Sequence, residues 1–204
     1  ILIDRDEPGD GCSKGNAGAL SPGSCIPLSS PGILRNVPKW LFDASGPLCI
    51  RPSYLFCAIP WLVRFAAAGR ANRINALADA LRALNRHTFE NYAPLVGNAG
   101  CTDLIRNTGS LAVFKTEKGL AGSAREWDIR AARQVRQQQL DAGELHELVP
   151  GLSTEYRHGI LLPDHGFVAD PHRLTRSLTE AFVRDGGVVM RAAVKRIEPL
   201  AGGV

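Results

Sequence analysis

The sequence predicts an α/β fold in which the two ends of the chain build one parallel sheet and the middle forms an inserted α+β domain. The chain opens on the apolar run Ile1–Ile3, which ends at Asp4 and is followed at once by a glycine-rich loop. Near the other end, an amphipathic helix leads into the apolar run VVM. Apolar runs of this kind are typical of buried parallel strands, and a helix that feeds one is typical of α/β sheets. The first strand is therefore expected to be short, buried and parallel.

The middle of the chain carries helical and strand patterns in turn. Ile74, Leu77, Leu81 and Leu84 recur at helical spacing, which predicts one helix from 70 to about 97. The run TDLIRNTGSLAVFKTE then predicts two strands joined by a turn at 107–109. A second helix is expected from 117 to about 143, and HGILLP reads as a strand.

The last helix has the clearest signals. Asp170 is a helix N-cap residue, Pro171 suits the first helical position, and the pair Gly186–Gly187 is a C-terminal stop. The runs VVM and AAVKRIEPL that follow are predicted to be strands.

The composition is that of a folded globular protein, with 45% hydrophobic and 22% charged residues in 204. A net charge of +4 permits anionic ligands without requiring nucleic acid. Five cysteines, an odd number without C-x-x-C pairs, argue against a disulfide framework and a zinc site, and favour reduced thiols in the cytosol. The apolar stretch YLFCAIPWLVRFAAAG is interrupted by Pro60 and Arg64. It is too short to cross a bilayer, and a core helix or loop is favoured over a membrane-interface segment.

The opening stretch is where the sequence points to a ligand. An acid at the end of a strand, such as Asp4, can accept hydrogen bonds from ribose hydroxyls, with a glycine fingerprint expected about 20 residues upstream. No such fingerprint precedes Asp4, the chain begins at Ile1, and its only methionine is Met190. We therefore interpret the sequence as an internal piece of a longer protein. On the residues alone, the loop after Asp4 is either an ordinary turn or a segment that approaches a phosphate or a planar ring.

The stretch LIDRDEPGDGCSKGNAGALSPGSCIPLSSPGILRNVPKWLF resembles the second strand and flavin loop of the FAD-dependent oxidoreductases of the D-amino-acid oxidase superfamily. Within these, it is most similar to the D-amino-acid dehydrogenase small-subunit group. RNTGSLAVFKTE, ELVPGLS and GILLPDHGFVADPHRLTRSLTEAFVRDGG resemble later parts of the same proteins. The resemblance implies an incomplete Rossmann-like FAD-binding domain at 1–45 and 166–204, with the substrate domain at 46–165.

The resemblance also implies roles for single residues. The expected FAD-binding residues are Asp4 at the ribose with Arg5 beside it, Ser13 near the pyrophosphate, Asn16, Ala17 and Gly18 near the flavin, and Val194 at the adenine. Arg106 is a candidate for substrate contact and His165 lies near the same strands, although a structural or solvent-exposed role is the favoured alternative for each. No catalytic side chain and no metal site is nominated.

The implied activity is dehydrogenation of the C–N bond of D-amino acids to imino and then keto acids, with hydride transfer to FAD. Alternatives are a sarcosine, glycine or hydroxyproline oxidoreductase of the same superfamily, or a non-catalytic truncated remnant. The 204-residue chain by itself is expected to be inactive. The electron acceptor is a quinone or oxygen, and the expected location is cytoplasmic, with room for peripheral attachment at the inner membrane.

Overall fold

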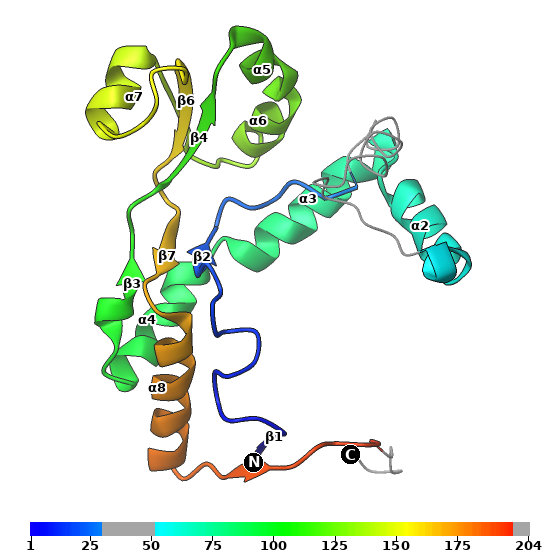
Figure 1. The fold of residues 1–204 in the computed structure, drawn as a ribbon, viewed down its shortest axis with the longest axis vertical. Coiled ribbons are helices and arrows are strands. Elements are labelled where there is room, and N and C mark those ends of the chain that lie inside the picture. Colours follow the sequence, from blue (N-terminus) through cyan, green and yellow to red (C-terminus); the bar gives the residue numbers. More distant parts are fainter. Residues whose placement is uncertain (30–51, 198–204) are drawn as a thin grey trace. The chain divides into compact units, whose positions relative to one another are not determined.

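The computed structural model describes residues 1–29 and 52–197 (Figure 1). The chain forms two compact units. The first comprises Ile1–Pro22, His87–Leu111 and Leu162–Val204, and the second comprises Gly23–Arg86 and Ala112–Leu161. Both mix helices with short strands, so the α/β class predicted from the sequence is confirmed at that level. The Rossmann-like sheet and the domain boundaries at 45 and 165 stay predictions.

The first unit joins the start of the chain to its last described strand. β1 (Leu2–Asp4) pairs in parallel with β8 (Val189–Arg191), with Leu2 opposite Val189 and Asp4 opposite Arg191. The parallel direction is as predicted. The predicted burial is wrong, because Leu2 is 41% and Ile3 47% exposed. The side chains of a strand point to the two faces of its sheet, and exposed fractions of this size show that little of the described chain packs on the faces of β1.

The core of the first unit lies around a second small sheet. In that sheet, β7 (Gly166–Val168) is antiparallel to both β2 (Ala19–Leu20) and β3 (Ile105–Arg106). The α-helix α4 (Thr88–Asn98) and the 3₁₀ turn η2 (Thr102–Leu104) complete this region. The buried cluster consists of Leu20, Val96, Cys101, Leu104, Val168 and Leu174. It ties the N-terminal segment to the later ones.

The helix α8 (Pro171–Arg184) confirms the predicted end signals. The Asp170 carboxylate accepts the backbone N–H of Arg173 at 2.9 Å, and Pro171 begins the helix. Gly186 has φ of 92°, a conformation that glycine adopts at little cost after a helix end. These local contacts fix where the helix begins and ends.

The second unit places helices on both faces of a small sheet. β4 (Ser110–Phe114), β6 (His158–Leu162) and β5 (Gln138–Leu140) lie in that order, with β5 antiparallel to β6. Three short helices accompany it: α5 (Glu117–Gly122), α6 (Ala124–Ala131) and α7 (Ala142–Leu148). The turn η1 (Pro52–Tyr54) leads into α2 (Leu55–Ala68), which is followed by α3 (Ala71–Asn85).

Four sequence expectations differ from the structure. The predicted helix from 70 to 97 is two helices, α3 and α4, separated at 86–87. The region 117–143 contains two short helices and then β5, because Gln134 takes φ of 57° after α6. β3 and β4 do not pair with each other: β3 pairs with β7, and the Gly109 N–H donates to the His165 carbonyl. Residues 192–197 form no strand, and the rest of the AAVKRIEPL run lies outside the described residues.

The described cysteines are free thiols in two environments. Cys25 and Cys101 are buried, whereas Cys12 and Cys57 are exposed. Burial raises the pKa of the Cys25 thiol above its ordinary value of 9.0, against the opposing effect of Arg130, Arg133 and Arg82. Burial and the charge of Asp103 likewise raise the pKa of the Cys101 thiol.

We expect Cys12 and Cys57 to react rapidly with a thiol reagent in the native protein, and Cys25 and Cys101 to react only on unfolding.

The folded state keeps the buried thiols of Cys25 and Cys101 protonated to a higher pH than the unfolded chain does. The free energy of unfolding should therefore be full below pH 9.0 and should fall as the pH rises past that value. Mass spectrometry of pulse-labelled protein measures the reactivity, and urea unfolding at several pH values measures the stability. Rapid native labelling of Cys25 or Cys101 would contradict the buried assignment.

Candidate functional site

The candidate site begins at the carboxyl ends of β1 and β8. The Ala192 N–H donates to the Asp4 carbonyl at 2.8 Å, so the paired strands end together. Asp4 is exposed, and one of its carboxylate oxygens accepts the Asp6 N–H at 3.1 Å. The carboxyl ends of parallel strands are where α/β sheets bind ligands. An exposed carboxylate at this edge can accept hydrogen bonds from a ligand.

The chain after Asp4 is held close to β8 by Arg191. The Arg191 Nε donates to the Arg5 carbonyl at 3.2 Å, and its Nη1 lies 2.9 Å from the Glu7 carboxylate. The Arg5 Nε lies 3.0 Å from the Asp6 carboxylate. Arg5 therefore meets a neighbouring carboxylate in this structure, and its predicted part in cofactor binding stays a prediction.

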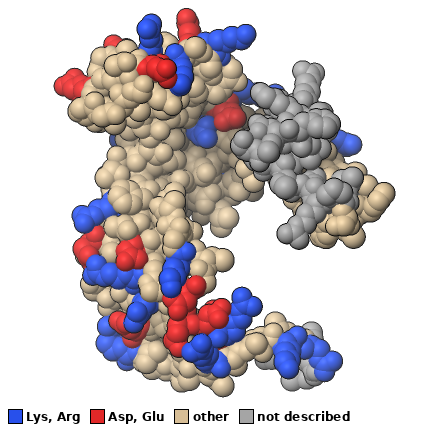
Figure 2. All heavy atoms as spheres, viewed as in Figure 1, with Lys and Arg blue, Asp and Glu red and all other residues tan. Residues whose placement is uncertain are grey.

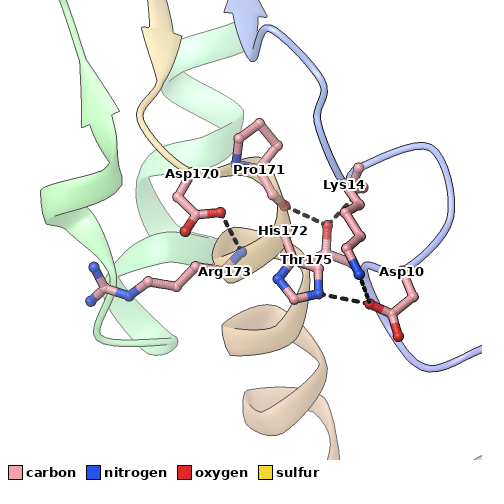
Figure 3. Close-up of polar contacts among 8 residues, drawn as sticks. Asp10, Lys14, Asp170, Pro171, His172, Arg173 and Thr175 are labelled. Atoms are coloured by element: carbon pink, nitrogen blue, oxygen red, sulfur yellow. Dashed lines mark hydrogen bonds and ion pairs between the residues drawn. The ribbon is translucent and has the colours of Figure 1, made fainter.

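The glycine-rich loop packs against the first turns of α8. Figure 3 shows His172 and Thr175 reaching from the helix toward the loop that carries Asp10 and Lys14. The His172 Nε2 lies 3.1 Å from the Asp10 carboxylate, and the Lys14 Nζ lies 3.7 Å from it. Gly9 has φ of 92°, and a Cβ there would lie 2.8 Å from the His172 ring. The loop is thus held to the helix by the His172–Asp10 contact and by the close approach of Gly9 to His172.

The hydroxyls of Ser13 and Thr175 form a second contact between loop and helix. Thr175 Oγ1 lies 3.0 Å from Ser13 Oγ and 2.9 Å from the Pro171 carbonyl. A carbonyl can only accept, so Thr175 uses its one proton there and Ser13 donates to Thr175. Ser13 is then an acceptor toward solvent. A phosphate oxygen also only accepts, so Ser13 can donate to one only after the Thr175 proton rotates toward Ser13.

Replacing Thr175 by Val should loosen the loop, because the variant keeps the shape of the side chain and loses the hydroxyl. We expect a stability loss of about 1 kcal/mol and faster amide hydrogen exchange in peptides covering 10–16. Thr175→Ser should behave like the parent. Thr179→Val is a matched control, since Thr179 donates to the Thr175 carbonyl at 2.9 Å on the same helix and, within the described part of the chain, forms no hydrogen bond to the loop. Equal exchange in the two Val variants would show that Thr175 does not hold the loop.

The end of the loop makes the closest backbone contact of the site. Gly18 has φ of 68°, and a Cβ there would lie 2.3 Å from the Val168 carbonyl oxygen. Its own carbonyl accepts the Val168 N–H at 2.8 Å, and its N–H donates to the Asn16 side chain at 2.7 Å. Asn16 therefore orients the backbone of this turn. The side chain of Ala17 is exposed.

A groove of about 600 Å³ lies between the loop and α8. Charged residues of both signs line the groove: Glu7, Asp10 and Glu180 are acidic, and Arg176 is basic. Figure 2 shows the same mixture, with blue and red side chains interleaved over the lower part of the molecule in that view. Neighbouring ion pairs such as Arg191–Glu7 account for it. The groove is not a purely cationic surface of the kind that binds nucleic acid.

Of the remaining predicted residues, Val194 lies near Asp4, and Arg106 and His165 lie in other strands or loops of the first unit. Val194 is 59% exposed and follows β8 by three residues, at the same edge of the sheet as Asp4. Arg106 is exposed in β3, opposite Phe167, and His165 is buried between β6 and β7. Sequence reasoning missed Thr175, His172, Asp10 and Arg191, whose partners lie far away in the chain. The described residues contain no group of three potential metal ligands.

The whole sequence matches one family model. Residues 1–204 match the model described as FAD dependent oxidoreductase. The chain belongs to this FAD-dependent oxidoreductase family. Its resemblance to the family, drawn above from Asp4 and the loop, is thereby confirmed.

Relatives of this FAD-dependent family act on amino acids, as their names state. The chain is 34% identical over 194 residues to a D-amino-acid oxidase of Bradyrhizobium diazoefficiens, a match that covers 94% of this chain and 46% of that protein. It is 30% identical to a D-amino acid dehydrogenase of Rhizorhabdus wittichii, covering 91% of this chain and 45% of the relative. The chain thus spans less than half the length of these relatives.

A solved structure supports the same fold. The glycine oxidase of Geobacillus kaustophilus matches 92% of this chain and 38% of its own, with a TM-score of 0.52 and 19% sequence identity. At this identity the match shows the fold alone. It agrees with a mixed α/β member of the FAD-dependent oxidoreductase family.

Proposed function

We propose that this chain supplies one wall of the FAD site, and part of the substrate domain, of an amino-acid oxidoreductase. The observation that carries the proposal is the exposed carboxylate of Asp4 at the carboxyl end of a parallel strand, directly before a loop fixed to α8. The family match and the names of the relatives support the same reading.

The residues present fit the adenosine half of FAD. The Asp4 carboxylate has one oxygen bonded to the Asp6 N–H, which leaves the other for ribose hydroxyls. A Cβ at Gly11 or at Gly15 would meet no heavy atom within 4 Å, so the backbone there is open to a ligand. We assign Asp4 to the ribose, the loop with Ser13 to the pyrophosphate side, and Asn16, Ala17 and Gly18 to the flavin side. Val194 is assigned to the adenine.

FAD, when bound, accepts the hydride that leaves the substrate carbon next to the nitrogen. The residues of this chain bind the cofactor and orient the groups that contact it. Asp4 receives the ribose, Asn16 holds the Gly18 turn through its 2.7 Å hydrogen bond, and Thr175 sets which way the Ser13 proton points. Arg106 is exposed and so is free to meet a substrate carboxylate, which keeps it a candidate.

The proposed substrates are D-amino acids, because the relatives at 34% and 30% identity are named for them. Glycine, sarcosine and hydroxyproline are the alternative substrates that the resemblance to the superfamily implies. Proposed electron acceptors are a quinone or oxygen. The proposed location is the cytoplasm, with peripheral attachment to a membrane. Among the described residues no helix is long and apolar enough to span one.

The test uses the protein encoded by the complete open reading frame that contains this chain. We expect a flavin absorbance band at one FAD per chain, bleached anaerobically by D-amino acids and less by glycine or sarcosine. The 204-residue chain by itself, which contains no G-x-G-x-x-G, should hold less than one FAD per chain. A complete protein that purifies without flavin and takes up none when FAD is added would overturn the proposal.

A further inference from the structure

One face of the small sheet in the first unit carries a cation beside an aromatic ring. Ala19 of β2 and Arg106 of β3 are both direct partners of Phe167 in β7, the middle strand (Figure 1). Directly opposed residues of antiparallel strands have their side chains on the same face of the sheet. The three side chains therefore form a row across the three strands.

The burial of the neighbouring residues identifies which face this is. Leu20 and Val168 alternate with the row and belong to the buried cluster, and Ile105 packs against that cluster. All three members of the row are exposed instead, and Phe167 is 38% exposed. The row thus faces away from the core of the first unit.

Arg106 brings a guanidinium without a partner to this face. Within the described part of the chain, its side chain forms no ion pair and no hydrogen bond. Arg173 of the same unit, by contrast, pairs with Asp103 at 2.8 Å. A guanidinium presents a planar set of donors that matches the two oxygens of a carboxylate. Arg106 can therefore bind a carboxylate without giving up a contact within the described chain.

The row begins at the turn that is assigned above to the flavin side. Ala19 directly follows Gly18, and the Gly18 carbonyl accepts the Val168 N–H at 2.8 Å, next to Phe167 in β7. Neighbouring strands are about 4.8 Å apart, so β3 lies roughly 10 Å from β2. An amino acid held by its carboxylate at Arg106 extends across Phe167 toward the turn.

The backbone beneath the row is fixed by close contacts between β7 and β3. A Cβ at Gly166 would overlap the Arg106 carbonyl oxygen, so any other residue would push β3 away. Beyond the strands, the Ala169 N–H donates to the Leu104 carbonyl at 2.8 Å and continues the pairing. Residues that bind a ligand need rigid support of this kind.

We propose that Arg106 and Phe167 bind the substrate of this oxidoreductase, and that Phe167 selects for amino acids with apolar side chains. Arg106 receives the substrate carboxylate, whose charge is opposite to its own. Phe167 contacts the substrate side chain, which leaves the α-carbon and its nitrogen toward the Gly18 turn. The inference rests on the proposed function and adds a specificity-determining residue to it.

The experiment uses the FAD-loaded protein from the complete open reading frame, with 3-phenylpropanoate as the probe. This compound has the carboxylate and the apolar side chain of phenylalanine but no amino group, so calorimetry measures its binding apart from turnover. Arg106→Gln should weaken binding of the probe by about tenfold or more, because charge-assisted hydrogen bonds are lost. Arg106→Lys should recover part of the affinity, since it keeps the charge.

Phe167→Ala should change the choice among substrates. We expect kcat/KM for D-phenylalanine and D-leucine to fall roughly tenfold relative to D-alanine, because only the larger side chains reach the aromatic ring. Phe167→Leu keeps an apolar side chain and should lie between the parent and Phe167→Ala.

Phe182→Ala and Arg184→Gln are the matched controls. Phe182 is 38% exposed, like Phe167, and Arg184 is an exposed arginine of the same unit. Both lie in the last turn of α8, and Arg184 is about 20 Å along that helix from its first residue. Neither control should change the affinity for the probe or the substrate preference.

Two results with FAD at one per chain would overturn the inference and leave the proposed function intact. They are equal probe affinity in the Arg106→Gln and Arg184→Gln variants, and an unchanged ratio of D-phenylalanine to D-alanine turnover in Phe167→Ala. Loss of FAD from the Arg106 or Phe167 variants would also overturn it, because these residues would then act on the cofactor. The FAD content of the parent protein tests the proposed function separately.

Discussion

Gly18→Ala should destabilise the first unit by about 3 kcal/mol. The new Cβ would lie 2.3 Å from the Val168 carbonyl oxygen, at a position where φ is 68°. The left-handed conformation is unfavourable for alanine, and the backbone at residue 18 must also move away from Val168. That movement breaks the 2.8 Å hydrogen bond from the Val168 N–H to the Gly18 carbonyl, next to the buried cluster that contains Leu20.

Gly15→Ala is the control for this effect. Gly15 has φ of 74°, close to that of Gly18, but a Cβ there would meet no heavy atom within 4 Å. Only the conformational cost remains, about 1 kcal/mol. Urea unfolding of the two variants separates strain from steric overlap. Equal losses in both would mean that the contact between Gly18 and Val168 is not close in solution.

Asp4→Ala should weaken FAD binding by more than about a hundredfold in the protein encoded by the complete reading frame. The ribose would lose two hydrogen bonds to a charged carboxylate, and each is worth about 1.5 to 3 kcal/mol in such settings. Asp4→Asn should retain part of the affinity, because an amide oxygen still accepts one hydrogen bond. Titration of the apoprotein with FAD, followed by flavin fluorescence, gives the dissociation constants.

Asp6→Ala controls for charge in the Asp4 experiment. Asp6 is also an exposed carboxylate, and its side chain pairs with Arg5 at 3.0 Å instead of facing the strand edge. Its loss should change FAD affinity little. A comparable loss in both variants would indicate that general negative charge, and not the Asp4 position, affects binding.

The parts of the fold that local chemistry determines were predictable from the sequence. Asp170 and Pro171 fix the start of α8 through contacts within one helical turn. The apolar run before Asp4 forms a parallel strand, as its composition predicts. Gly18 stood out as a residue type suited to close backbone approach, and its conformation requires glycine.

Other features depended on contacts that no local pattern reveals. The turn at 107–109 contains residues typical of a hairpin, yet the Gly109 N–H donates to the His165 carbonyl. The flanking strands do not pair with each other, because β3 pairs with β7 and β4 pairs with β6. The apolar spacing from Ile74 onward continues past residue 85, so periodicity does not reveal the break between α3 and α4. Thr175 contacts Ser13 across 162 residues of chain, and a threonine within a helix gives no signal of such a partner.

The most direct test of the account is hydrogen exchange in the protein from the complete reading frame, compared with and without bound FAD. We expect protection in peptides covering residues 4–18 and around Val194, with little change over α2. Protection that leaves 4–18 untouched while FAD is bound at full occupancy would contradict the assignment of this loop to the flavin site.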